Sequence, residues 1–160
     1  MANQHSYFKI SRGPQFEAEL KRLGATPAKI EKAIGDELIT TANVIRNHII
    51  KSFAKKKTGI FYKRTKKNIL YQSSAPWEPP AVDTGDLKKS IKMDVRRMGL
   101  LDRMEVEVGS NLKGKYGKYP IFLEFGTKNM EPRPWLRPAF DAGKLLFYAG
   151  IKRHILEAMR

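Results

Sequence analysis

The apolar residues of this chain change from a helical to a strand spacing, and this change restricts the fold more than any other feature of the sequence. From Pro27 to Phe53 they recur every three or four residues, which predicts one long amphipathic helix with Thr26 as its N-cap. From residue 90 to residue 109 they alternate with charged residues, which predicts two half-buried strands. The apolar positions that set the two periods are Ile30, Ile34, Leu38, Ile45, Ile49 and Phe53 in the helix, and Ile91, Met93, Val95, Met104, Val106 and Val108 in the strands.

The two strands, Ser90–Met98 and Arg103–Gly109, are separated by a short connection. We therefore predict an antiparallel hairpin whose charged side chains face outward. Weaker signals predict a short helix from Pro14 to Gly24, an edge strand from Phe8 to Ser11, and a third strand from Tyr119 to Phe125.

A second helix is predicted from Pro138 to Met159, with Gly143 and Gly150 as its weak points. Its apolar positions are Phe140, Leu145, Tyr148, Ile151 and Ile155. Length and the 41% share of hydrophobic residues suit one core, so residues 1–160 are expected to form a single domain. The predicted class is α+β: a small antiparallel sheet packed against a long N-terminal helix and a C-terminal helix.

The positive charge is concentrated in one segment. The chain carries 31 Lys and Arg against 16 Asp and Glu, and no acidic residue lies between Leu38 and Trp77. Residues 54–80, which end in several Ser and Pro residues, are therefore interpreted as a long basic loop or arm inserted before the sheet. Its basic residues are Lys55, Lys56, Lys57, Lys63, Arg64, Lys66 and Lys67.

Catalytic and metal-binding motifs are missing from the sequence. Without cysteine there is no disulfide or thiolate zinc site, and the three histidines follow no metal-ligand spacing, so we expect no cofactor and no metal. The carboxylates of Asp94, Asp102, Glu105 and Glu107 allow a nuclease hypothesis, but ion pairs with Lys92 and Arg96 on a solvated sheet face account for them better. No apolar run is long enough to span a bilayer, and the N-terminus is unlike a secretory signal.

Two stretches are more specific than composition requires. The first runs from Pro80 to Ile91 and contains a turn in which Asp83 and Thr84 can bond nearby amides and Gly85 supplies an unusual φ. The second, from Tyr119 to Phe140, is interpreted as a strand, a glycine turn, a proline-braced loop and a helix. Each is equally explained as a rigid structural corner or as a contact surface.

In this order, the motifs D-T-G-x-L-x-x-S-I, Y-x-x-x-L-E-F-G-T and R-P-W-L-R-P-A-F resemble the neck family of long-tailed bacteriophages and prophages. These are the head–tail joining, or tail completion, proteins. The resemblance covers mainly residues 82–141 and, in outline, the preceding long helix.

The resemblance implies a non-enzymatic structural protein of the virion, made in the bacterial host cytoplasm. Such a protein forms a homo-oligomeric ring at the head–tail junction, between portal-side head-completion proteins and tail terminator or tail tube proteins. Double-stranded DNA passes through the lumen without sequence readout, and no membrane is involved. The residues implied to define the fold and to lie near protomer or partner contacts are Asp83, Thr84, Gly85, Leu123, Glu124, Phe125, Gly126, Thr127, Arg133, Pro134, Trp135 and Arg137.

The arm departs from the family pattern, in which only a short link separates the long helix from the D-T-G turn. Its role must therefore be argued from its own residues. Lysines facing inward could contact phosphates, whereas Tyr62, Tyr71 and Trp77 would suit packing against a neighbouring subunit, which we favour. The alternative to the whole reading is a free basic nucleic-acid-binding module, because aromatic residues are interleaved with the lysines.

Overall fold

A computed structural model describes residues 7–11, 27–64, 69–98 and 103–158. The elements in chain order are β1 (Tyr7–Ser11), α2 (Pro27–Phe53), β2 (Phe61–Arg64), β3 (Ile69–Gln72), α3 (Asp86–Ser90), β4 (Ile91–Met98), β5 (Arg103–Ser110), the 3₁₀ turn η1 (Gly114–Tyr116), α4 (Tyr119–Phe125) and α5 (Arg137–Ala158). Both long helices and both central strands confirm the predicted α+β class. The predicted helix at 14–24, the Thr26 cap and the connection at 99–102 lie outside the described residues.

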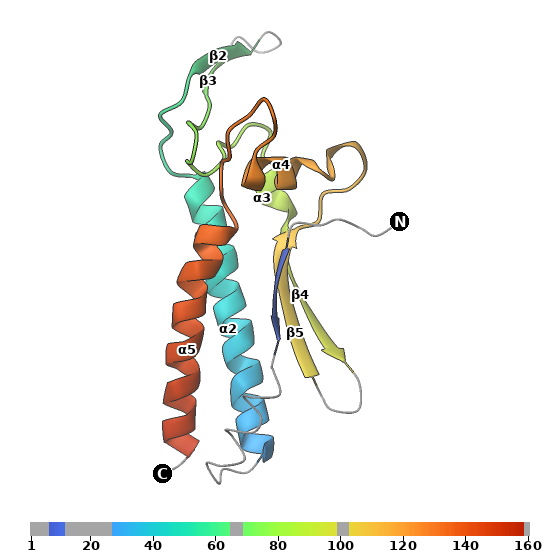
Figure 1. The fold of residues 1–160 in the computed structure, drawn as a ribbon, viewed down its shortest axis with the longest axis vertical. Coiled ribbons are helices and arrows are strands. Elements are labelled where there is room, and N and C mark those ends of the chain that lie inside the picture. Colours follow the sequence, from blue (N-terminus) through green and yellow to red (C-terminus); the bar gives the residue numbers. More distant parts are fainter. Residues whose placement is uncertain (1–6, 12–26, 65–68, 99–102, 159–160) are drawn as a thin grey trace.

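The elements form three layers, in which α2 is the middle one. Figure 1 shows α5 running antiparallel beside α2, and the sheet lying on the opposite side of α2. The short helices α3 and α4 lie at the upper end of the sheet, and the β2–β3 hairpin stands above the end of α2. Because α2 contacts both neighbouring layers, it carries the largest share of the core.

The buried face of α2 follows the predicted period. Its buried apolar residues recur at steps of three and four, as expected of one helical face. They pack against buried residues of the sheet, α4 and α5 in one continuous core. The buried apolar residues of α2 are Ile34, Leu38, Ala42, Ile45, Ile49 and Phe53.

Contact between α2 and α5 depends on the two glycines that the sequence marked as weak points. A β-carbon at Gly143 would collide with the Ile45 side chain, and one at Gly150 would collide with the carboxyl group of Glu37. The predicted apolar face of α5 is partly wrong, since Leu145 is 73% exposed and Tyr148 is also exposed. Small residues let the helix axes approach, so the two glycines occupy the seam, whereas Leu145 and Tyr148 point outward.

Three strands form an antiparallel sheet in the order β1-β5-β4. Val106 pairs with Val95 and Val108 with Met93, which confirms the predicted hairpin, and β1 confirms the predicted edge strand. On the outer face Arg96 lies 3.3 Å from Glu107, an ion pair of the predicted kind. Of the carboxylates considered for a nuclease, Asp94, Glu105 and Glu107 thus belong to the charged outer face of the sheet, and Asp102 lies outside the described residues.

The predicted third strand is wrong, because residues 119–125 form the helix α4. Pro120 stands in the first turn, where its missing N–H costs nothing, and the buried residues are Pro120, Leu123 and Glu124. That spacing is helical, but a seven-residue apolar run is too short for its period to be decisive. Gly126 ends the helix with a φ of 77°.

The arm at residues 54–80 is not only a loop. Its middle forms the two-stranded antiparallel hairpin β2–β3, with Tyr62 opposite Tyr71 and Lys63 opposite Leu70. We call this element the arm hairpin. Each strand has only four residues and neither alternates apolar with polar residues, so the sequence pattern does not reveal them.

Candidate functional site

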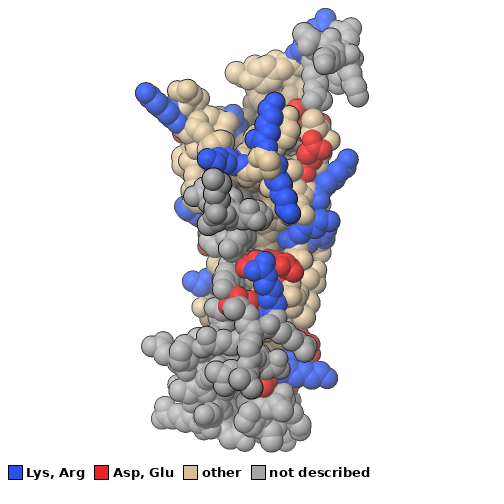
Figure 2. All heavy atoms as spheres, turned by 90° about the vertical axis from the view of Figure 1, so that its right-hand side faces the viewer, with Lys and Arg blue, Asp and Glu red and all other residues tan. Residues whose placement is uncertain are grey.

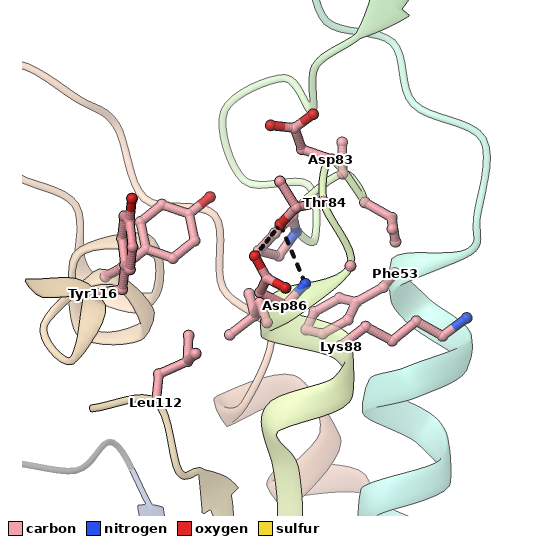
Figure 3. A pocket seen from close by; sticks show the side chains of 13 residues that line it. Phe53, Asp83, Thr84, Asp86, Lys88, Leu112 and Tyr116 are labelled. Atoms are coloured by element: carbon pink, nitrogen blue, oxygen red, sulfur yellow. Dashed lines mark hydrogen bonds between the residues drawn. The ribbon is translucent and has the colours of Figure 1, made fainter. Parts of the chain in front are cut away.

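The D-T-G turn positions a single turn of helix before β4. Gly85 adopts the predicted left-handed backbone, with a φ of 85°. The Thr84 hydroxyl accepts a hydrogen bond from the Asp86 amide and donates one of 2.6 Å to the Asp86 carboxylate (Figure 3). The turn therefore stabilises the start of α3.

The serine of the same motif has a structural role. Ser90 Oγ and Ser110 Oγ lie 2.7 Å apart in the interior, and Ser90 also donates to the Leu87 carbonyl. Because Ile91 pairs with Ser110, this contact fastens the start of β4 to the end of β5.

Glu124 holds the second and third motifs together. Its carboxylate is 5% exposed and accepts hydrogen bonds of 2.8, 2.8 and 2.9 Å from the backbone amides of Trp135, Leu136 and Arg137. These amides open α5, so the carboxylate caps the positive end of that helix. The hydrogen-bond donors of this carboxylate are thus backbone amides.

Trp135 fills the corner between α4 and α5. It is 1% exposed, its indole N–H donates to the Pro120 carbonyl, and its ring lies 6.0 Å from that of Phe53. Arg133 is also fixed, with its Nε donating to the Ser74 carbonyl at the base of the arm. The corner thus joins α2, α4, α5 and the arm.

The twelve predicted contact residues fall into three groups. Leu123, Glu124 and Trp135 are buried in this chain; Gly85, Gly126, Arg133 and Pro134 are half-buried; Asp83, Thr84, Phe125, Thr127 and Arg137 are exposed. The three residues of the buried group lie in the interior of this chain. A contact role stays a prediction, and only the exposed group can fill it directly.

The base of the arm is held by Glu78. Its carboxylate accepts hydrogen bonds from the Thr58 hydroxyl, at 2.6 Å, and from the amides of Thr58 and Ala75. Lys57, one of the predicted basic contacts, is buried and donates to the Ser52 carbonyl at the end of α2. Burial lowers the pKa of this ammonium, and Glu78 opposes the effect. Lys57 therefore belongs to the arm's foundation.

We expect the base of the arm to loosen at acid pH. The Thr58 hydroxyl and then the two amides hold the pKa of Glu78 below its ordinary value. The contribution to stability is complete above that ordinary value and is lost as the pH falls through the lowered one. An NMR titration should show the amide protons of Thr58 and Ala75 shifting with a midpoint below the usual glutamate range. Glu78→Gln should abolish this titration; an unchanged titration in that variant would contradict the assignment.

Beyond its base, the arm exposes large apolar side chains. Residues on both faces of the arm hairpin are more than half exposed, and Trp77 is 68% exposed. Of the predicted basic contacts, Lys55, Lys56 and Lys63 are also exposed, the Arg64 side chain is not described, and Lys66 and Lys67 lie outside the described residues. The exposed apolar residues of the arm are Ile60, Phe61, Tyr62, Leu70 and Trp77.

A pocket of about 440 Å³ opens beside the D-T-G turn. Its walls come from the end of α2, from residues 80–88 and from the segment 112–119 (Figure 3). Phe53, Leu112 and Tyr116 give it an apolar lining, and the Asp83 and Asp86 carboxylates lie on the turn side. Burial, and next the Asp83 carboxylate, raise the pKa of the Tyr119 hydroxyl in its wall. An apolar, aromatic pocket with few polar groups is typical of a binding site.

Basic side chains gather on one face of the molecule (Figure 2). Figure 2 shows Lys and Arg projecting along the face on the side of β4, with fewer acidic groups among them. Within the described ranges, no three His, Asp or Glu side chains come together to hold a metal ion. In the same ranges, no helix has the length and apolarity that crossing a membrane requires.

Comparison with known proteins identifies the family. A family model described as "Bacteriophage HK97-gp10, putative tail-component" matches residues 15–126. The match contains the long helix, the arm, the D-T-G turn and α4, and it ends before the R-P-W-L-R-P-A-F motif. No curated protein and no solved structure matches. Since the match covers more than half of the chain and contains the first of its three motifs and all but the last residue of the second, this chain belongs to the HK97-gp10-like family of bacteriophage tail components.

Proposed function

We propose that this tail component is a neck protein, which forms a homo-oligomeric ring at the head–tail junction of the virion. In this position it lies between the portal-side head-completion proteins and the tail terminator or tail tube. DNA passes through the lumen, and the protein catalyses no reaction. The observation that carries the proposal is the apolar arm hairpin, which this chain leaves largely exposed.

An exposed apolar hairpin is unusual for a free monomer. A two-stranded hairpin is at best marginally stable alone in water, and large exposed apolar patches mark interaction sites. Subunit association would bury these side chains. A heterologous contact between two different patches of the chain closes a ring when the rotation closes.

The positive charge suits a DNA path. A formal net charge of +15 supplies a long-range attraction for phosphates that does not depend on sequence. The same charge, together with Phe61 and Tyr62 beside Lys63, would also serve the alternative, a free single-strand or duplex binder. The two functions differ in oligomeric state and in how strongly salt affects DNA binding.

The test is the mass of the purified protein at moderate salt, by light scattering, alone and with a short duplex. We expect one closed oligomer, visible as a ring by negative-stain electron microscopy, whose mass the duplex leaves unchanged. A monomer that binds the duplex tightly, with an affinity that falls steeply with salt, would establish the alternative.

A charge variant separates assembly from folding. Replacing Lys55, Lys56 and Lys63 with Gln should weaken assembly or DNA retention and leave the thermal midpoint of the monomer unchanged, because all three side chains are exposed. Lys57 is left intact since it is buried. The matched control replaces three exposed lysines elsewhere, Lys92, Lys144 and Lys152, and should assemble normally.

A further inference from the structure

We infer that the arm hairpin of one copy docks on the pocket beside the D-T-G turn of a second copy. The inference rests on the proposed ring and names the two surfaces that would form its repeated contact. The projecting surface is the arm hairpin with Phe61 and Leu70. The receiving surface is the pocket walled by Phe53, Leu112 and Tyr116.

In the part of the chain that the structure describes, no residue of the arm hairpin belongs to the hydrophobic core or packs against it. The register Lys63 opposite Leu70 and Phe61 opposite Gln72 puts Phe61 and Leu70 on one face, where they are 56% and 65% exposed. Tyr62, on the other face, is also more than half exposed. Figure 1 shows the hairpin standing away from the three layers. Burial of this apolar face would stabilise the hairpin.

Trp77 supplies an independent sign that the arm is shaped for contact. It has a φ of 66°, the one positive value among the described non-glycine residues. This strained backbone is held by its N–H donating to the Pro132 carbonyl at 2.8 Å, and the indole is left 68% exposed. Strain of about 1–3 kcal/mol is retained mainly at functional positions. An exposed tryptophan held in this way is a natural anchor for an interface.

The pocket has the size and chemistry to receive such side chains. Its volume of about 440 Å³ exceeds the space of one large side chain, and its lining is mainly apolar. In Figure 3 the Lys88 side chain extends toward α2, away from Tyr116, whereas Asp83 and Asp86 remain at the turn side. Lys88 also lines the pocket and the segment 112–119 carries Lys113, Lys115 and Lys118, so burial of apolar side chains rather than charge would drive the contact.

The exposed apolar surface of the arm supplies part of the area that a specific interface buries. The five exposed apolar residues of the arm present roughly 500 Å², given the size of aromatic side chains. Each side of a standard interface buries about 800 Å². The exposed lysines around these residues would supply the polar rim of the interface. Because the projecting and receiving surfaces are different parts of the same chain, a second copy can supply each.

The absence of cysteine makes a direct test possible, because only engineered thiols react. Lys63→Cys puts a thiol on the hairpin face that carries Phe61 and Leu70, and Lys113→Cys puts one next to Leu112 of the pocket. The two single variants, one of which carries an added peptide tag so that their masses differ, are mixed and treated with a short bismaleimide, so a mixed product must join two copies. The control pair combines Lys63→Cys with Lys144→Cys, an exposed position on α5.

We expect the first pair to give at least about ten times more mixed dimer than the control pair, because docking raises the effective concentration of the thiols. Adding Phe61→Ser and Leu70→Ser to the hairpin variant should remove this excess. Rings without the mixed product would overturn the inference and leave the proposed function standing. Mixed dimers without rings would support the inference and overturn the proposal that the chain forms a ring. A chain that neither associates nor cross-links would overturn the inference. If duplex DNA then raised the mass measured by light scattering, the arm hairpin would instead be interpreted as a surface that binds a polyanion.

Discussion

Glu124→Ala is expected to lower the free energy of unfolding by about 3–4 kcal/mol, because three backbone amides lose a buried charged acceptor at once. For a domain of this size the thermal midpoint should fall by roughly 10 °C. Urea unfolding followed by tryptophan fluorescence measures the loss, since Trp135 lies directly on this corner.

Two variants show whether the amide contacts cause the effect. Glu131→Ala removes an exposed carboxylate from the neighbouring loop and should change stability by less than about 0.5 kcal/mol. Glu124→Gln keeps an acceptor oxygen without the charge and should fall between wild type and Glu124→Ala. If Glu131→Ala and Glu124→Ala were equally destabilising, the cap on α5 would not be the cause.

The capping role of Glu124 also shows what sequence reasoning could not reach. The motif order marked residues 119–140 as a unit, and the family match confirms its first part. Pairing of Glu124 with backbone amides depends on α4 directing this second-turn side chain toward the start of α5, eleven residues later. With 119–125 taken as a strand, that geometry was not available. A glutamate next to a proline-braced helix start was the only signal.

The long elements were predictable because their periods extend over many residues. α2 repeats its apolar step through seven turns, and apolar residues alternate with charged ones over residues 91–96 of β4 and 103–108 of β5. The arm hairpin has four residues per strand, and neither strand alternates apolar with polar residues. Its exposure, and the pocket between α2, the D-T-G turn and the 112–119 segment, arise from tertiary packing that no local pattern contains.

The contact between α2 and α5 requires glycine at a helix position where glycine is ordinarily unfavourable, and one substitution tests this. Because valine has a slightly better helix propensity than glycine, Gly143→Val should be nearly neutral by helix propensity alone. Because the added atoms would collide with Ile45, we expect a loss of about 2–3 kcal/mol instead. Ala149→Val, at an exposed position of the same helix, is the control and should cost no more than about 0.7 kcal/mol.

A double-mutant cycle separates this collision from a general loss of helix. Ile45→Ala alone should cost about 2–5 kcal/mol by leaving a cavity in the core. In Gly143→Val/Ile45→Ala the valine can enter that cavity. The double variant should therefore lose at least about 1 kcal/mol less stability than the sum of the losses in the two single variants. Strict additivity in urea unfolding would mean that the helices do not meet at this glycine. The coupling would instead show that glycine is required at position 143 by the closeness of α2, which places α5 and the exposed Leu145 and Tyr148 on the outer face of the molecule.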